Sequence, residues 1–152
     1  MKVKRQHSTS FFIFSLISVF TLTGCPWGEM KYYPAEKVIA WMKNDEVCFS
    51  VPESRGYQPV FISINLRRTP PKKKRFVENP ILLVRENNLC VPPSFYQFPD
   101  NSEIPYIVEF ILQSQNKSNP PRSFIAGFNM IAGKTSGVQL TKLEYDVPVR
   151  EY

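Results

Sequence analysis

The stretch that decides the fold is "PYIVEFILQ", residues 105–113, in which the side chains alternate between two faces. One face of this stretch is apolar: Tyr106, Val108, Phe110 and Leu112. The other face is mixed: Ile107, Glu109, Ile111 and Gln113. A period of two that is rich in β-branched and aromatic residues is typical of a half-buried strand. The stretch therefore predicts a strand that packs one face against a core.

Two more stretches repeat this alternation. "QPVFISINL" (58–66) has an apolar row at Val60, Ile62, Ile64 and Leu66. "RSFIAGFNMIA" (122–132) has one at Phe124, Ala126, Phe128 and Met130. Turn-forming clusters separate these runs, and a helical stripe nowhere extends beyond a turn or two. We therefore expect an all-β fold, a single antiparallel β-sandwich (Ig-like or similar) of about seven to nine short strands.

An internal echo adds detail to this fold. "VIAWMKNDEVCFSVP" (38–52) and "ILLVRENNLCVPP" (81–93) both run strand, basic residue, Asn-bearing turn, strand with a cysteine, then proline. The pattern predicts two similar hairpins, each with a cysteine on its second strand. With only two copies, a chance similarity is the alternative.

The N-terminus has the features of an export signal. Lys2, Lys4 and Arg5 precede an apolar run at 11–22 that is shorter than the ~20 residues of a membrane-spanning helix. "LTGC" (22–25) resembles the lipobox of bacterial lipoproteins, in which the cysteine becomes the first mature residue and carries lipid. We expect a signal peptide at 1–24, a lipidated N-terminus and tether at 25–36, and a β-sandwich domain at 37–152. The alternative is an uncleaved anchor in which Cys25 is incidental.

Cleavage before Cys25 would leave 128 residues, with 16 basic and 13 acidic side chains. The only histidine, His7, would leave with the signal, so the mature domain would lack imidazole. That excludes Ser-His-Asp and Cys-His catalysis and the usual histidine zinc sites. We expect no catalytic residue, no metal, no small-molecule substrate and no cofactor apart from the lipid on Cys25. The protein is predicted not to be an enzyme.

The lipobox resemblance also predicts a location. Pro26 follows the cysteine, whereas in enterobacterial lipoproteins an Asp at that position commonly retains the protein at the inner membrane. The resemblance therefore favours the outer membrane, with the lipid anchor in the membrane and the domain in the periplasm.

The remaining cysteines, Cys48 and Cys90, are an even pair in an oxidising compartment. We predict a disulfide that closes a 43-residue loop and contributes roughly 4 kcal/mol. Two buried free thiols are the alternative. Each cysteine lies between apolar neighbours, so if those neighbours face the core, both sulfurs lie on the opposite face of the sheet. The bridge would then be a surface staple between the two hairpins.

Two stretches are candidate interaction sites. "RRTPPKKKR" (67–75) supplies six cations that suit an acidic partner or anionic lipid, with nucleic acid made improbable by export: Arg67, Arg68, Lys72, Lys73, Lys74 and Arg75. Its alternative is a solvated hairpin loop. "PPSFYQFPDN" (92–101) supplies three aromatic candidates for partner contact: Phe95, Tyr96 and Phe98. Their alternative is a cap over the core, and Tyr106 is a candidate tyrosine-corner residue.

A family resemblance rests on "CFSVPESRGYQPVFISIN" (48–65), "TPP" (69–71), "LCVPPSFYQFPD" (89–100) and "YIVEF" (106–110). These stretches resemble small enterobacterial lipoproteins of a type VI secretion system immunity group. The resemblance implies a periplasmic protein that neutralises an antibacterial effector by protein–protein contact, and it supplies no functional residues. The alternative function is a structural or assembly lipoprotein of an envelope machine.

Overall fold

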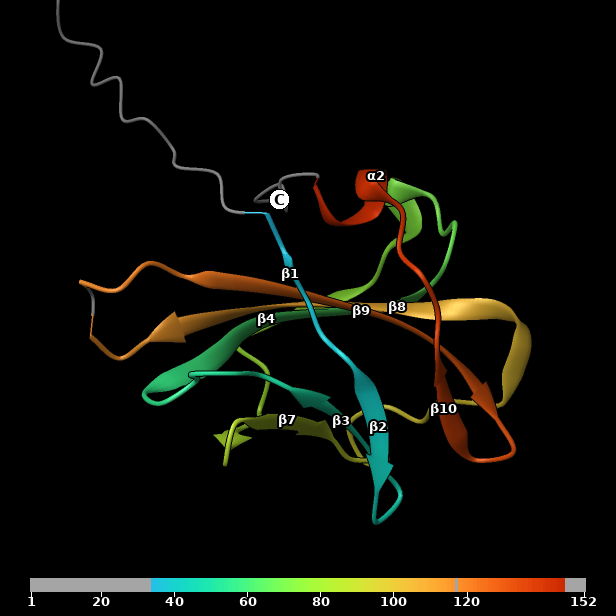
Figure 1. The fold of residues 1–152 in the computed structure, drawn as a ribbon, viewed down its shortest axis with the longest axis horizontal. Coiled ribbons are helices and arrows are strands. Elements are labelled where there is room, and N and C mark those ends of the chain that lie inside the picture. The colour runs from blue at the N-terminus through green and yellow to red at the C-terminus, as the bar shows by residue number, and fades with distance from the viewer. Residues whose placement is uncertain (1–33, 117, 147–152) are drawn as a thin grey trace, which may run out of the picture. The chain divides into compact units, whose positions relative to one another are not determined.

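Two β-sheets build the protein, as the computed structural model shows for residues 34–116 and 118–146 (Figure 1). The six-stranded sheet has the order β1-β9-β8-β4-β5, and β10 also pairs with β9. Its strands are β1 (Glu36–Lys37), β4 (Tyr57–Leu66), β5 (Phe76–Glu78), β8 (Asn101–Ser114), β9 (Arg122–Ile131) and β10 (Lys134–Gly137). The four-stranded sheet has the order β2-β3-β7-β6. Its strands are β2 (Ala40–Lys43), β3 (Glu46–Ser50), β6 (Val84–Arg85) and β7 (Asn88–Val91).

The prediction of an all-β sandwich is confirmed, with two differences in detail. The described residues contain ten strands, whereas we expected seven to nine. The short strands β1 and β6 have two residues each, which is too few to show an alternating pattern in the sequence. Pairing is antiparallel except between β1 and β9, which run parallel. Two short helical segments, η1 (Pro71–Lys73) and α2 (Lys142–Tyr145), lie outside the sheets.

The three long strands β4, β8 and β9 are those that the alternation predicted, and they lie side by side. One predicted row is interrupted. The register between β4 and β8 shifts between Pro59 and Phe61, so Val60 has no partner on β8 and lies outside the core cluster. A β-bulge of this kind inserts one extra residue, and Pro59 suits it because proline has no N–H to donate to a ladder.

The echo in the sequence corresponds to two hairpins of the same construction. The β2–β3 turn has positive φ at Asn44 (49°) and Asp45 (64°). The β6–β7 turn has positive φ at Glu86 (49°) and Asn87 (61°). Two-residue turns with both central residues in the left-handed region match the twist of the flanking strands. The prediction of two similar hairpins is therefore confirmed.

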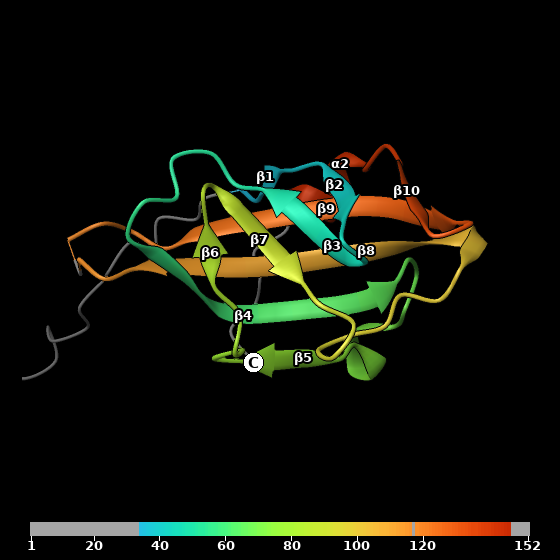
Figure 2. The same ribbon diagram turned by 90° about the horizontal axis from the view of Figure 1, so that it is seen from below.

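The second strands of the two hairpins pair antiparallel, which places Cys48 directly opposite Cys90. The hairpins are thus related by an approximate two-fold axis through this cysteine pair. Figure 2 shows β3 and β7 crossing β8 and β9 diagonally, as one layer of the sandwich over the other. The two layers enclose the core between them.

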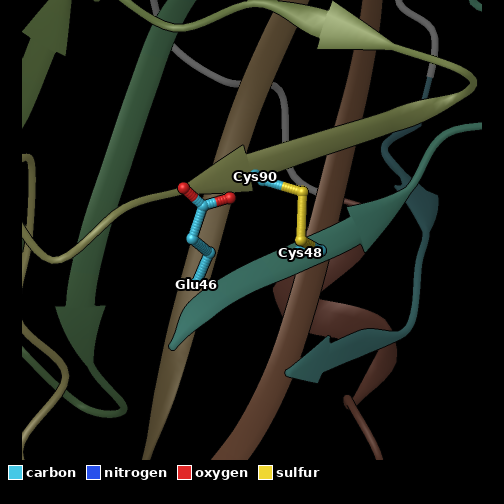
Figure 3. A group of neighbouring side chains, drawn as sticks. All are labelled: Glu46, Cys48 and Cys90. Carbon is cyan, nitrogen blue, oxygen red and sulfur yellow. A yellow bond between two sulfur atoms is a disulfide. The ribbon is translucent and has the colours of Figure 1, made fainter. Parts of the chain in front are cut away.

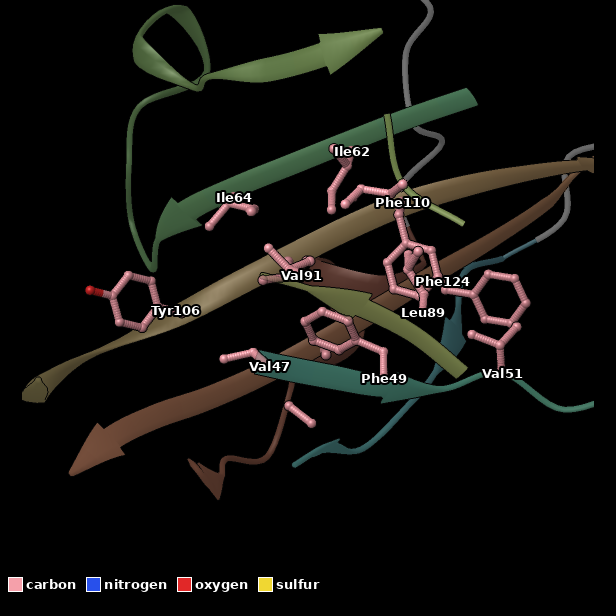
Figure 4. Close-up of a cluster of buried hydrophobic side chains, with 14 of the residues drawn as sticks. Val47, Phe49, Val51, Ile62, Ile64, Leu89, Val91, Tyr106, Phe110 and Phe124 are labelled. Atoms are coloured by element: carbon pink, nitrogen blue, oxygen red, sulfur yellow. The ribbon is translucent and has the colours of Figure 1, made fainter. Parts of the chain in front are cut away.

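The core consists of inward side chains from both layers (Figure 4). Phe49 is fully buried, and its ring centroid lies 5.5 Å from that of Phe110 and 6.2 Å from that of Phe128. Phe110 in turn stacks on Phe124 at 5.2 Å. Tyr106 is 3% exposed and donates its hydroxyl to the carbonyl oxygen of Pro99 at 3.0 Å, the hydrogen bond expected of a tyrosine corner.

Residues 138–146, here called the C-terminal strap, run over the outer face of the six-stranded sheet. Val138 donates its backbone N–H to the carbonyl oxygen of Gly127 at 3.0 Å. A Cβ atom on Gly127 would lie only 2.8 Å from Leu140, so glycine permits this close approach. At its end the strap reaches the first strand, because Ala35 donates its N–H to the carbonyl oxygen of Tyr145 at 3.1 Å.

The first strand of the sheet begins at Glu36. Glu36, which we expected to end the tether, pairs with Phe124 in the six-stranded sheet. Its carboxylate also accepts two hydrogen bonds of 2.8 Å from Arg122. These long-range contacts carry no local pattern, which is why the sequence placed the boundary after Glu36.

Candidate interaction surface

The basic tract forms the loop that joins β4 to β5, and its base is held by buried polar groups. Asn65 is 7% exposed, accepts the backbone N–H of Arg75 at 2.8 Å and donates to the carbonyl oxygen of Arg75 at 3.0 Å. Ser63 donates to the same carbonyl at 3.1 Å. Within the loop, η1 supplies one tight turn. The loop is therefore fixed at both ends to neighbouring strands.

The six cations of this loop fall into two groups. Arg67 pairs with Glu144 of the C-terminal strap through two hydrogen bonds of 2.7 Å, and Lys74 pairs with Glu109 at 3.1 Å. The other four are exposed and make no ion pair or side-chain hydrogen bond in the described part of the chain: Arg68, Lys72, Lys73 and Arg75. The four exposed cations, here called the free cations, are available to a partner. Arg67 and Lys74 hold the fold together.

The ion pair with Arg67 has a clear electrostatic effect. The Arg67 guanidinium lowers the pKa of Glu144 to about 2, helped by hydrogen bonds from Thr141 and opposed by partial burial. The same pairing raises the pKa of Arg67 above its usual value. Glu144 also completes a capping box with Thr141 at the start of α2. One carboxylate therefore fixes both the loop and the strap.

The three aromatic candidates pack against the core. Tyr96 and Phe98 meet edge to face at 4.7 Å, and Phe98 lies 5.4 Å from Tyr106 and 5.6 Å from Phe128. Phe95 is half-buried against the same cluster. This packing is what the core-capping alternative expects, while contact of these rings with a partner stays a prediction.

Tyr96 nevertheless links this cap to the basic loop. Burial raises the pKa of its phenol, and the nearby cation of Arg75 offsets part of that rise. An electrostatic influence of this kind requires that the two side chains are close in space. The phenol of Tyr96 therefore lies within electrostatic reach of the basic loop.

The sequence analysis missed a group of exposed apolar side chains directly after the loop. Half of the large exposed hydrophobic residues in the described chain lie between positions 76 and 83. They are Phe76 (41% exposed), Val77 (45%), Ile81 (99%) and Leu83 (55%). The signal was present, because these apolar residues follow directly after a tract of cations.

The predicted disulfide is present, and it lies on the face of the four-stranded sheet that the alternation indicated. It is not the predicted surface staple, because Cys48 is 0% exposed and only Cys90 is partly accessible. Cys48 and Cys90 are bonded, and their neighbours Val47, Phe49 and Leu89 are buried in the core on the other face. Glu46 lies beside the bridge, with a carboxylate oxygen within 4.8 Å of both sulfurs (Figure 3). This trio is the one set of metal-ligand side chains among the described residues, and its sulfurs are not thiolates because they are bonded to each other.

A shallow hollow of about 280 Å³ lies on the same outer face. Trp41 and Leu83 flank the disulfide there, at equivalent positions of the two hairpins. Charged side chains of both signs line the hollow, among them Lys43 and Glu86. Unlike the basic loop, the residues that line the hollow have no excess of positive charge.

The N-terminal predictions fall outside the described residues. They comprise the signal peptide, the lipobox and the lipidation of Cys25, and they stay predictions. Over the described part of the chain, no helix has the length and apolar character needed to span a bilayer.

Comparison with known proteins gives one match. The model of a family described as "Domain of unknown function (DUF7480)" matches residues 35–133. This range includes both hairpins, the basic loop and the three long strands. No curated protein and no solved structure matches the chain.

Proposed function

Because the chain belongs to the DUF7480 family, whose description names no activity, we propose its function from the interaction surface. The protein is a binding protein of the immunity type, anchored by lipid on Cys25 to the periplasmic face of the outer membrane. It neutralises an antibacterial effector of the type VI kind by direct protein–protein contact. The observation that carries this proposal is the group of free cations on a loop fixed at both ends.

The physical case is that such an inhibitor needs a rigid scaffold and a complementary charged surface, without chemistry of its own. The disulfide joins the two hairpins of one sheet, and the ion pairs of Arg67 and Lys74 hold the loop against the other. A rigid loop loses little conformational freedom on binding. Four exposed cations that form no ion pair with the described residues would speed association with an acidic surface.

The test is a matched pair of variants challenged with an effector. Candidate effectors encoded beside this gene are produced with and without a periplasmic signal in cells lacking the protein. The wild-type protein should restore growth when the effector is in the periplasm. The triple variant Lys72→Ser, Lys73→Ser, Arg75→Ser should protect less, and its association rate constant should fall about tenfold at low salt and depend less on salt.

The control removes the same charge elsewhere. The triple variant Lys43→Ser, Arg55→Ser, Lys134→Ser changes three exposed cations outside the loop and should leave protection and association rates unchanged. Equal association rate constants for the two triple variants would show that the loop takes no part in binding and is only a solvated hairpin loop. Failure to protect against every such effector, combined with a loss of secretion or envelope integrity on deletion, would favour a structural lipoprotein instead.

A further inference from the structure

The strand that follows the basic loop, β5, ends the six-stranded sheet. It pairs with β4 on one side, and among the described residues no strand pairs with its other side. All three of its residues are exposed. Figure 2 shows β5 on the far side of β4 from β8, beyond the area crossed by β3 and β7.

The inner face of β5 is uncovered as a result. Val77 lies opposite Ile62, which is 1% exposed in the core, so both side chains point to the inner face. Val77 is nevertheless 45% exposed, because the four-stranded sheet does not extend over it. An apolar side chain is therefore presented beside a strand edge that no strand of the described residues covers, which is an arrangement that suits pairing with another strand.

The orientation of the backbone follows from the hydrogen bonds to β4. Asn79 donates its N–H to the carbonyl oxygen of Val60 at 2.8 Å, and Val60 and Asn79 continue the register of the β4–β5 pairs. In an antiparallel ladder, successive residues alternate between facing the partner strand and facing away from it. The N–H and C=O of Glu78 therefore face away from β4, toward the open edge.

The segment that contains this edge is mainly basic. Residues 67–85 include seven basic side chains and a single acidic one, Glu78. The free cations Lys72, Lys73 and Arg75 immediately precede β5. Cations at an exposed edge also discourage pairing between the edges of two copies of the protein. This is the simplest alternative explanation for their presence. They would at the same time attract a strand that carries carboxylates.

We propose that β5 is the docking edge for an extended, acidic segment of the partner protein, which adds to the six-stranded sheet as a further strand. Main-chain hydrogen bonds at Glu78 would supply affinity, and carboxylates of the segment would contact the free cations. An apolar side chain of the segment would cover Val77. This inference rests on the proposed function, since it takes the ligand to be a protein, and it adds how that protein is held.

The test uses the full-length chain, labelled with nitrogen-15, and a nine-residue peptide that alternates glutamate with valine. Saturating peptide should slow hydrogen exchange of the Glu78 amide by about tenfold or more. A control peptide with lysine in place of glutamate should not. The measurement needs no variant, so it does not depend on how a substitution folds.

A pair of substitutions separates strand addition from simple charge attraction. Glu78→Pro removes the outward N–H without removing a hydrogen bond to β4, and it should weaken peptide binding by about tenfold. Glu78→Thr removes the same carboxylate, keeps the N–H and should bind at least as well as the unaltered chain. The melting temperatures of both variants show whether the fold is intact.

Two results would overturn the inference. One is binding of the acidic peptide with no protection of Glu78 and equal affinity for both variants, which would leave only a charge patch. The other is perturbation of this edge by vesicles of phosphatidylglycerol and not by the peptide, which would point to a lipid surface. Both results come from purified protein and do not depend on protection against an effector in cells. They can therefore be told apart from a failure of the immunity proposal.

Discussion

The two cysteine hairpins have the same construction and different surroundings. Their turns share the left-handed conformation, and their cysteines meet at the centre of one sheet. The turn of the first hairpin makes no side-chain hydrogen bond within the described residues. In the second, Asn87 accepts hydrogen bonds from the backbone N–H of Ser54 at 3.2 Å and from its hydroxyl at 3.0 Å.

The hairpins also differ in what they bury. Phe49 of the first hairpin contacts Phe110 and Phe128, whereas the equivalent position of the second hairpin is Val91. The first hairpin thus supplies a large share of the core, while the second supplies the anchor for a neighbouring loop. A repeated local pattern therefore specifies a local structure, and its contribution to stability depends on what lies next to each copy.

The largest effect is expected from truncating the two equivalent core positions. Phe49→Ala should lower the free energy of unfolding by about 3–5 kcal/mol, because a ring between two others leaves a cavity. Val91→Ala should cost about 2 kcal/mol, because fewer buried methyl groups are lost. Urea unfolding of both variants measures the difference. Equal losses would contradict an unequal division of the core between the hairpins.

Next in size is the bond that joins the hairpins. The double variant Cys48→Ala, Cys90→Ala should lower the free energy of unfolding by about 2–4 kcal/mol, because the unfolded chain loses its cross-link. The double variant retains the main-chain ladder between β3 and β7. Thermal melts of the oxidised protein and the double variant provide the measurement, and coincident melts would show that the ladder alone joins the hairpins.

The turns offer a matched test at a single position. Asp45→Ala should cost about 1 kcal/mol, because alanine is disfavoured at positive φ. Asn87→Ala should cost about 2 kcal/mol, because it also leaves buried Ser54 without its side-chain partner. The comparison uses unfolding midpoints of both variants. If the two cost the same, the hydrogen bonds to Ser54 add nothing and the hairpins are alike in stability as well as shape.

The smallest effect lies outside both hairpins, in the strap. The folded pKa of Glu144, about 2, is below the ordinary 4.5, so its contribution is complete above about pH 4.5 and disappears as the pH falls toward 2. The side chains of this ion pair are 25% and 24% exposed, so solvent screening limits its contribution to about 1 kcal/mol. Glu144→Gln should remove this acid dependence, which unfolding free energies at pH 5 and pH 3 would detect. An unchanged slope in the variant would assign the acid sensitivity elsewhere.

Much of the fold was predictable because the decisive signals are local. The alternation in 105–113 and 122–132 identifies two long strands, and the Asn-bearing turns identify both hairpins. The face of the disulfide followed from the same period of two, since a buried neighbour on each side puts a cysteine on the opposite face. These inferences need only residues within a few positions of each other.

What escaped prediction depends on contacts between distant parts of the chain. Nothing near Arg67 in the sequence shows that it pairs with Glu144, so the tract reads as six equivalent cations, although two of them form ion pairs within the described part of the chain. Val60 fits the apolar row of its strand in the sequence, yet a β-bulge takes it out of the register with β8. The exposure of Val77 depends on the absence of a covering strand, which no local pattern encodes.

The short strand β1 has a mechanical consequence. A pull on the chain from the N-terminal side of residue 34 would enter the domain at Ala35 and Glu36. That load passes through the two hydrogen bonds from Arg122 into β9, and through the carbonyl oxygen of Tyr145 into the strap. It reaches the six-stranded sheet first. A force applied at this point therefore acts on the six-stranded sheet before it acts on the disulfide-linked hairpins of the other layer.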